Sequence, residues 1–269
     1  MIHIVNQSNR HLYARQIWEM YVERRKSFVE RNGWDDLMVF DGAEVDDFDD
    51  ERAVYLMALD DHGQLEGAVR FRPTDDKSIL FDKYSHLVAP DQPSLKGPET
   101  WEGTRVFTTE TFRKSRQPGQ RGFYGLALAG REVALDHGAK HAVGMMDIRM
   151  LDKVSASAAT EIKILGLPAE YGYGVMVATC VEVSAANNER TLESLAEPMR
   201  LSYEITDEDV EAFGSVLAAQ RTVEAARWAS NQDGSEDYRD PARAIAHATA
   251  LFAKHDFMSA GELEGWTGS

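Results

Sequence analysis

Residues 53–73 read AVYLMALDDHGQLEGAVRFRP, a pattern typical of a β-hairpin with a short polar turn in its middle. Successive side chains of a strand point to opposite faces, so Val69 and Phe71 are expected to face one way. The arginines between and after them, Arg70 and Arg72, are then expected to face the other way. The hairpin therefore predicts a sheet with one apolar face and one face that carries arginines.

Runs with helical or strand periodicity lie on both sides of this hairpin. The predicted helices cover residues 12–31, 123–137 and 154–165, and the predicted strands cover residues 100–107, 140–147 and 175–183. After about Thr206 the strand-like runs end, and helices are predicted over residues 207–228 and 240–254. We therefore predict an α+β domain at 1–205, followed by an acidic helical extension at 206–269.

The strand predicted at residues 100–107 carries several polar side chains. Period two places Trp101, Arg105 and Phe107 on one of its faces. The same periodicity places Glu102 and Thr104 on the opposite face.

The composition excludes several classes of protein. The chain has 269 residues and a formal net charge of −16, and an acidic surface repels the phosphates of nucleic acids. The single cysteine, Cys180, excludes an internal disulfide and lies in an apolar run typical of a buried thiol. No signal peptide and no stretch long enough to span a membrane is visible, so a cytoplasmic protein is expected.

Charged and aromatic residues form an ordered series in the first 110 residues. The series runs Arg24-x-x-x-Phe28, Gly33-Trp34-Asp35, Glu44-x-Asp46-Asp47-Phe48-Asp49, Gly67-x-x-Arg70-Phe71-x-Pro73-Thr74 and Trp101-Glu102-x-Thr104-Arg105-Val106-Phe107. This series resembles the acyl-homoserine-lactone synthases, the bacterial autoinducer synthases. One departure is Thr104, where a serine is usual in that family, and the hydroxyl is kept.

The resemblance implies a fold and a reaction. The implied fold is a three-layer α/β/α sandwich that resembles the N-acetyltransferase fold, with the helical extension at its C-terminal end. The implied substrates are S-adenosylmethionine and an acyl thioester carried on acyl carrier protein or coenzyme A. The amine of S-adenosylmethionine is acylated, the lactone closes, and methylthioadenosine leaves. No metal and no further cofactor is implied.

The resemblance also implies site residues. The residues expected to bind S-adenosylmethionine are Arg24, Phe28, Trp34, Asp46, Asp49 and Arg105, and the catalytic residues are Glu102, Asp46 and Arg70. Aromatic rings suit the adenine and the sulfonium, an arginine can hold the carboxylate bidentately, and carboxylates suit the amine. Glu102 is the predicted base, directly or through a water molecule. The same charged residues can instead form an internal ion-pair network that orders this region.

Two further segments are assigned to the acyl donor. Arg113, Lys114, Arg116 and Arg121 form a basic, glycine-containing loop before a helix, and they are predicted to dock the donor's phosphates or an acidic carrier protein. The alternative is a solvated basic loop. Met146, Ile148 and Met150 are predicted to line the acyl pocket, and ordinary core packing explains them equally well.

Two other functions compete with this interpretation. An N-acetyltransferase that uses acetyl-coenzyme A needs a complete Arg/Gln-x-x-Gly-x-Gly/Ala loop to bind the pyrophosphate. Its reaction does not require the set Arg24, Phe28 and Trp34. A non-catalytic protein that binds a partner through its helical extension has no reason to keep the charged set intact.

Overall fold

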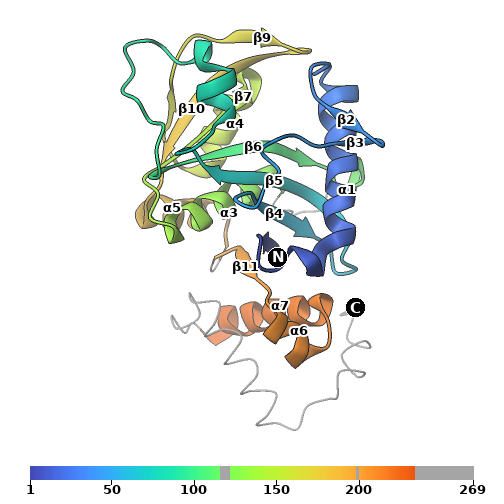
Figure 1. The fold of residues 1–269 in the computed structure, drawn as a ribbon. Coiled ribbons are helices and arrows are strands. Elements are labelled where there is room, and N and C mark those ends of the chain that lie inside the picture. Colours follow the sequence, from blue (N-terminus) through green and yellow to red (C-terminus); the bar gives the residue numbers. More distant parts are fainter. Residues whose placement is uncertain (116–121, 198–199, 234–269) are drawn as a thin grey trace.

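A nine-stranded mixed sheet forms the centre of the computed structural model, which describes residues 1–115, 122–197 and 200–233 (Figure 1). The strand order is β11-β1-β4-β5-β6-β7-β10-β8, and β9 pairs with β10. The strands are β1 (Ile2–Val5), β4 (Val54–Leu59), β5 (Leu65–Pro73), β6 (Thr100–Thr108), β7 (His141–Asp147), β8 (Ile162–Ile164), β9 (Ala169–Tyr171), β10 (Gly174–Glu182) and β11 (Ser202–Glu204). A separate short pair consists of β2 (Val39–Phe40) and β3 (Ala43–Glu44).

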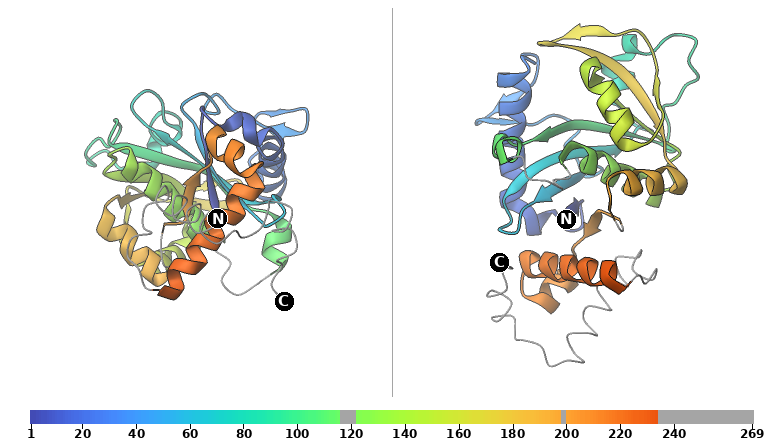
Figure 2. Two further views of the ribbon diagram at one scale, coloured as in Figure 1. Left: turned by 90° about the horizontal axis from the view of Figure 1, so that it is seen from below. Right: turned by 180° about the vertical axis from the view of Figure 1, so that it is seen from behind.

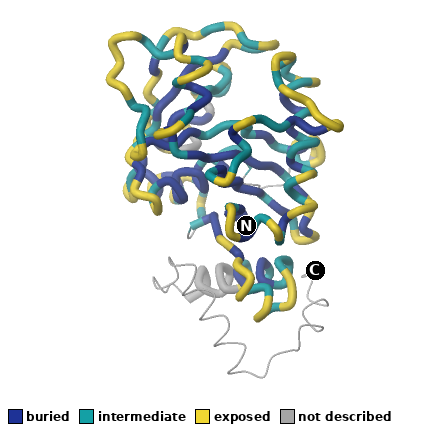
Figure 3. The backbone as a smooth tube through the Cα atoms, viewed as in Figure 1, coloured by how far each residue is buried: buried dark blue, intermediate teal, exposed yellow. Residues whose placement is uncertain are grey.

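Helices cover both faces of the sheet, which confirms the predicted three-layer sandwich (Figure 2). One face carries η1 (Arg10–Tyr13), α1 (Ala14–Arg24) and the π-helix η2 (Arg25–Arg31), and the other carries α3 (Gly122–Asp136), α4 (Leu151–Ala158) and α5 (Ala185–Ser194). The remaining short helices are η3 (Ile79–Lys83), η4 (Ser85–Leu87), α2 (Glu110–Ser115) and η5 (Ile148–Met150). Burial follows these layers, since the central strands are dark in Figure 3 and the surface loops are not.

The hairpin at residues 53–73 forms as predicted, as β4 and β5. Val69 and Phe71 pack into the core beneath α3, whereas Arg70 and Arg72 are buried on the α1 face and bind carboxylates there. Cys180 is buried in the core, as predicted.

The sheet splits between β6 and β7. These two strands run parallel and pair only from Thr100↔His141 to Gly103↔Gly144, although both continue beyond that point. A Cβ on Gly144 would lie 2.8 Å from the carbonyl oxygen of Gly103, so the strands approach too closely here for a larger residue. The split leaves backbone groups of both strands unpaired with each other, immediately beside the arginine-bearing strand β5.

Three local predictions are wrong. Residues 154–165 do not form one helix, because α4 ends at Ala158, Ala159 has a left-handed φ of 47°, and β8 then pairs with β10 at the sheet edge. The helix predicted at 207–228 is interrupted at Gly214, which has a φ of 84° and divides α6 (Asp207–Phe213) from α7 (Val216–Asp233). The helix predicted at 240–254 lies outside the described residues.

The third error concerns the face of Arg105. A bulge between the β5 and β6 pairings, with Arg105 at a φ of 56°, shifts the alternation of β6 by one residue. Trp101 therefore packs beneath α3, while Arg105 and Phe107 lie on the α1 face with Glu102 and Thr104.

The described helices after Thr206 pack against the sheet edge (Figure 1). Ala219 and Val223 of α7 contact Met1 and Tyr203, and the amino group of Met1 pairs with Glu224 at 2.5 Å. The division of the chain at residues 205 and 206 stays a prediction.

Candidate active site

A buried ion-pair network lies between α1 and the sheet. Arg24, at the end of α1, is fully buried, and its guanidinium donates bidentately to Asp49 at 2.7 and 3.0 Å. Its Nε donates to Glu44 at 2.5 Å, and Glu44 is also fully buried. A buried guanidinium is stable only with such partners, so these three groups depend on one another.

Arg70 and Arg105 complete the network from β5 and β6. Arg70 binds Asp46 bidentately at 2.5 and 3.0 Å and donates its Nε to the Thr104 hydroxyl at 3.0 Å. Arg105 donates to both Glu44 and Asp46 at 2.9 Å. The bulge in β6 directs its side chain to these carboxylates, as bulges commonly do beside active sites. Asp46 therefore joins two arginines.

The network keeps its carboxylates ionised. Burial alone would raise the pKa of Asp46, but the guanidiniums of Arg70 and Arg105 outweigh it and hold the pKa of that carboxyl far below its usual range. Burial also opposes ionisation of Asp49, and the guanidiniums of Arg24 and Arg70 lower its pKa below the usual value. Fixed negative charge is thus available at neutral pH beside the cavity described next.

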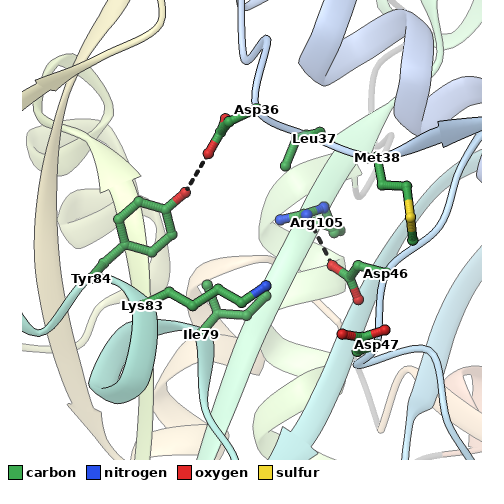
Figure 4. A pocket seen from close by; sticks show the side chains of 9 residues that line it. All are labelled: Asp36, Leu37, Met38, Asp46, Asp47, Ile79, Lys83, Tyr84 and Arg105. Carbon is green, nitrogen blue, oxygen red and sulfur yellow. Dashed lines mark hydrogen bonds and ion pairs between the residues drawn. The ribbon is translucent and has the colours of Figure 1, made fainter.

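A cavity of about 230 Å³ opens over this network (Figure 4). Its lining residues are Asp36, Leu37, Met38, Asp46, Asp47, Ile79, Lys83, Tyr84 and Arg105. Three carboxylates face two cations in this lining, which suits a ligand that carries positive charge together with a carboxylate. Of the predicted binding residues, Asp46 and Arg105 line the cavity, whereas Arg24, Asp49 and Arg70 lie in the network beneath it.

Aromatic side chains form a stack next to this cavity. The ring of Phe28 stacks on Trp34 with centroids 4.9 Å apart, and the guanidinium of Arg105 lies 5.8 Å from the Phe28 centroid. Trp34 contacts Tyr171, also at 4.9 Å; Tyr171 is the last residue of β9 and precedes the turn to β10. Gly172 is required there, because a Cβ would lie 2.2 Å from the Asn32 carbonyl oxygen.

Hydrogen bonds fasten this turn to the cavity wall. The Tyr171 hydroxyl donates to Asp36 at 2.6 Å, and it lies 2.8 Å from the Tyr84 hydroxyl. Asp36 and Tyr84 both line the cavity, so the turn braces two of its lining residues. Residues from four distant segments of the chain thus enclose one space.

Glu102 lies in the interior next to the network. Its carboxylate accepts the backbone N–H groups of Ile79 at 2.8 Å and Leu80 at 2.6 Å, which begin η3. Burial raises the pKa of Glu102 above its ordinary value, although these N–H groups oppose the shift. Ile79 lines the cavity and Glu102 does not, so Ile79 separates the Glu102 carboxylate from the cavity.

A second cavity, of about 120 Å³, lies on the α3 face of the sheet and has mostly apolar walls. Its lining includes Gly103 and Val106 of β6 and Gly144, Met145 and Met146 of β7, so it lies at the split. Of the residues predicted to line the acyl pocket, Met146 lines this cavity. Ile148 and Met150 belong to η5, are absent from this lining, and Ile148 is exposed.

The basic loop is described only in part. Arg113 and Lys114 are exposed on α2, where Arg113 donates to the Thr108 carbonyl and Lys114 pairs with Glu110. Arg116 and Arg121 lie outside the described residues.

Several residues that line the cavity or brace its wall were not found by the sequence interpretation. Asp36, Lys83, Tyr84 and Tyr171 belong to no periodic pattern that marks them, and only the fold brings them together. Glu44 did carry a signal, since it belongs to the quoted acidic motif, but a buried partner for two arginines was not assigned to it. Within the described ranges, no three His, Cys, Asp or Glu side chains form a group able to hold a metal ion. Among the helices in the described part, none has the length and apolar character needed to cross a membrane.

A sheet that splits between parallel strands, with a charged cavity on one face and an apolar cavity on the other, defines an acyltransferase-like protein. A family model described as autoinducer synthase matches residues 8–191, so the chain belongs to the autoinducer synthase family.

Similar proteins agree with this membership. An isovaleryl-homoserine lactone synthase of Bradyrhizobium diazoefficiens is 33% identical over 173 residues, or 63% of this chain and 74% of that protein. An acyl-homoserine-lactone synthase of Rhizobium etli is 33% identical over 49% of this chain and 62% of its own length. A solved CoA-dependent acyl-homoserine lactone synthase, in complex with SAM and isopentyl-CoA, is 28% identical, with a TM-score of 0.67 over 82% of this chain and 97% of that one. The chain is accordingly an acyltransferase of the acyl-homoserine-lactone synthase class.

Proposed function

We propose that this enzyme acylates the amine of S-adenosylmethionine with an acyl group from coenzyme A and then closes the lactone. The observation that carries the proposal is the position of the two cavities on opposite faces of β6, at the split from β7. An amine held on the charged side and a thioester on the apolar side meet at that split. Similarity to the CoA-dependent synthase supports coenzyme A as the carrier.

The charged cavity is the proposed site for S-adenosylmethionine. Asp46 holds the amine, and Arg105 or Lys83 binds the carboxylate. Phe28 and Trp34 form the aromatic side of the site, where a cation–π contact with the sulfonium contributes about 0.5–2 kcal/mol. Arg24, Asp49 and Arg70 act as positioning residues, because their charged groups are already bound to one another and to Asp46.

In the first step the α-amine attacks the thioester carbonyl, the C–N bond forms, and the thiolate leaves. The amine must lose a proton, and an α-amine with an ordinary pKa of about 7.7–8.0 needs only a modest shift to be neutral. Glu102 is the proposed base, through a water molecule, since Ile79 separates its carboxylate from the cavity. Backbone N–H groups of the split strands beyond Gly103 and Gly144 stabilise the oxyanion.

In the second step the carboxylate oxygen attacks the γ-carbon, the C–O bond forms, and the C–S bond breaks. The sulfonium takes the electron pair and departs as neutral methylthioadenosine. Because the sulfonium is already an activated leaving group, the enzyme needs mainly to position the carboxylate. The basic loop with Arg113, Lys114, Arg116 and Arg121 docks the phosphates of the donor.

Incubation with S-adenosylmethionine and a panel of acyl-coenzyme A and acyl-carrier-protein donors tests the proposal. Mass spectrometry should detect methylthioadenosine and an acyl-homoserine lactone in equal amounts, with coenzyme A esters as the better donors. Free thiol without methylthioadenosine, released when another amine is added to the mixture, would indicate an ordinary N-acetyltransferase, and absence of all products would indicate a non-catalytic protein. Either of these results contradicts the proposal.

Removing the Tyr171 hydroxyl should weaken the binding of S-adenosylmethionine. Tyr171→Phe loses the bond to Asp36, and a hydrogen bond of about 1 kcal/mol corresponds to about a fivefold rise in the KM for S-adenosylmethionine. The KM for the acyl donor should not change. Tyr173→Phe is the matched control two residues further along the chain, because Tyr173 is 76% exposed. Equal effects of both substitutions would refute the bracing role.

A further inference from the structure

Arg131 is a buried cation whose hydrogen-bond partners among the described residues are incomplete. It lies on α3 with 4% of its surface exposed, and its Nη2 donates to the Thr191 hydroxyl at 2.7 Å. Its Nη1 is buried and has no hydrogen-bond partner within residues 1–115, 122–197 and 200–233. The neighbouring acid, Glu132, directs its carboxylate to the backbone N–H groups of Leu201 and Ser202 instead. Nη1 thus lacks the carboxylate that a buried guanidinium normally finds.

Thr160 supplies a second buried polar atom at the same place. It is 7% exposed, and its hydroxyl oxygen likewise has no hydrogen-bond partner among the described residues. Arg131 and Thr160 both line the apolar cavity at the split. Leaving a buried donor unsatisfied costs about 1–3 kcal/mol, and more for a charged group. Two such atoms from different elements in one cavity indicate a missing polar ligand rather than a packing fault.

Both residues lie toward the end of the cavity where β6 and β7 are still paired. Helix α3 begins beyond the open ends of the split strands and ends just before β7 begins, so Phe123, Ala127 and Arg131, spaced four apart, follow the cavity inward. Thr160 lies two residues before Ile162 of β8, which is the partner of Val181 on β10. On its other side Val181 is the partner of Ala142 on β7, two residues before the split at Gly144. The polar atoms are therefore remote from the open ends of the split strands, where the proposed function places the thioester.

The charge on Arg131 persists at neutral pH. Burial lowers its pKa to about 10, and the nearby charge of Glu132 opposes the shift. A guanidinium that stays protonated donates hydrogen bonds only, so its complement is an oxygen acceptor.

We propose that Arg131 and Thr160 form a polar subsite that binds an oxygen acceptor carried near the distal end of the acyl chain. This inference rests on the proposed function, since it treats the cavity as the acyl pocket. A volume of about 120 Å³ is smaller than the roughly 300–1,000 Å³ of pockets for drug-sized ligands, so the chain is short. The favoured donors are short acyl thioesters with a terminal carboxylate or hydroxyl.

Acyl donors of equal chain length distinguish a terminal carboxylate, a terminal hydroxyl and a plain alkyl end. The experiment compares kcat/KM for three donors, with methylthioadenosine release as the readout. The donors are hexanoyl-coenzyme A, 6-hydroxyhexanoyl-coenzyme A and the six-carbon thioester of coenzyme A whose chain ends in a carboxylate. We expect at least a tenfold preference for an oxygenated donor, because the plain chain leaves the buried donors unpaired. The better of the two oxygenated donors identifies the acceptor as charged or neutral.

Arg131→Met should reverse this preference by lowering kcat/KM for the oxygenated donor and raising it for the plain one. Thr191→Val is the matched control, because it removes the bond to Nη2 but leaves Nη1 in the cavity, and it should keep the preference. If Arg131→Met fails a thermal-unfolding check, Thr160→Val replaces it and should reduce the preference.

Two results would overturn the inference. One is a wild-type enzyme that prefers the plain chain or does not discriminate. The other is a folded Arg131→Met or Thr160→Val variant in which kcat/KM changes by the same factor for every donor, so that the preference among donors is unchanged. In both cases release of methylthioadenosine from S-adenosylmethionine, with plain hexanoyl-coenzyme A as the donor, would leave the proposed function intact, whereas no product with any donor would refute that function.

Discussion

Glu102→Gln is expected to lower kcat at least tenfold, or about 1.4 kcal/mol of activation free energy, in a folded enzyme. The amide keeps the shape of the side chain, but Ile79 and Leu80 donate to separate oxygens of Glu102, so the single amide oxygen keeps only one of these two bonds. The amide also cannot take a proton from the amine. The loss should therefore appear in kcat, measured as methylthioadenosine release at saturating substrates.

The pH profile distinguishes a base from a structural residue. Burial raises the pKa of Glu102, and the base must be ionised to work, so kcat should fall as the pH drops through that raised pKa. The acid limb should accordingly lie above the ordinary glutamate value of about 4.3, and Glu102→Gln should remove it. An unchanged acid limb in a slower variant would assign Glu102 a purely structural role.

Glu132→Gln provides a matched control for this substitution. Glu132 is also buried, its pKa is also raised by burial, and it also accepts two backbone N–H groups, from Leu201 and Ser202. It lies at the other side of the sheet, beside β11. The two variants should lose similar stability in urea unfolding, but only Glu102→Gln should lose turnover. A comparable loss of kcat in both would mean that packing, not proton transfer, is responsible.

The sequence predicted what depends on local periodicity. The alternation of Val69, Arg70, Phe71 and Arg72 was enough to place arginines on one face of β5, because the pleat of a strand allows no other arrangement. The ordered series of charged residues was enough to identify the family. Both signals lie within segments of a few residues.

What depends on strain or on distant contacts was not predicted. The φ of 56° at Arg105 breaks the alternation that predicted its face. Position 105 is not a glycine, so the sequence does not indicate a bulge at this residue. The bond from Tyr171 to Asp36 joins residues 135 positions apart, and the ion pairs of Arg24 and Arg70 are one choice among several pairings. The roles of these residues in binding and catalysis stay predictions until the variants are measured.

Arg24→Ala is expected to destabilise the enzyme by about 3–5 kcal/mol and to lower turnover at least tenfold. The substitution leaves Glu44 fully buried without its 2.5 Å partner and removes both bonds to Asp49. Urea unfolding measures the stability, and kcat at the permissive temperature measures the activity. Arg24→Lys should not restore stability or turnover, because one ammonium cannot bind Glu44 and Asp49 with the geometry of a guanidinium.

A control at the surface, Arg52→Ala, removes ion pairs to Asp75 and Asp76. The Arg52 side chain is 35% exposed, so this substitution should lower the free energy of unfolding by no more than about 1 kcal/mol.

Acid unfolding then reports whether the network stabilises the fold through charge. The guanidiniums hold the pKa values of Asp46 and Asp49 below their usual range despite burial, so the folded state binds fewer protons than the unfolded state between the two sets of values. The stability that these carboxylates contribute is therefore fully present above a pH of about 4 and is lost as the pH falls through the lowered values. Without Arg24 the pKa of Asp49 rises toward or above its ordinary value, because burial then acts with less opposition. The acid-unfolding midpoint of Arg24→Ala should consequently move to higher pH than that of the wild type, while Arg52→Ala should leave it in place. A difference in the free energy of unfolding between Arg24→Ala and the wild type that stays constant as the pH falls would mean that Arg24 acts through packing alone.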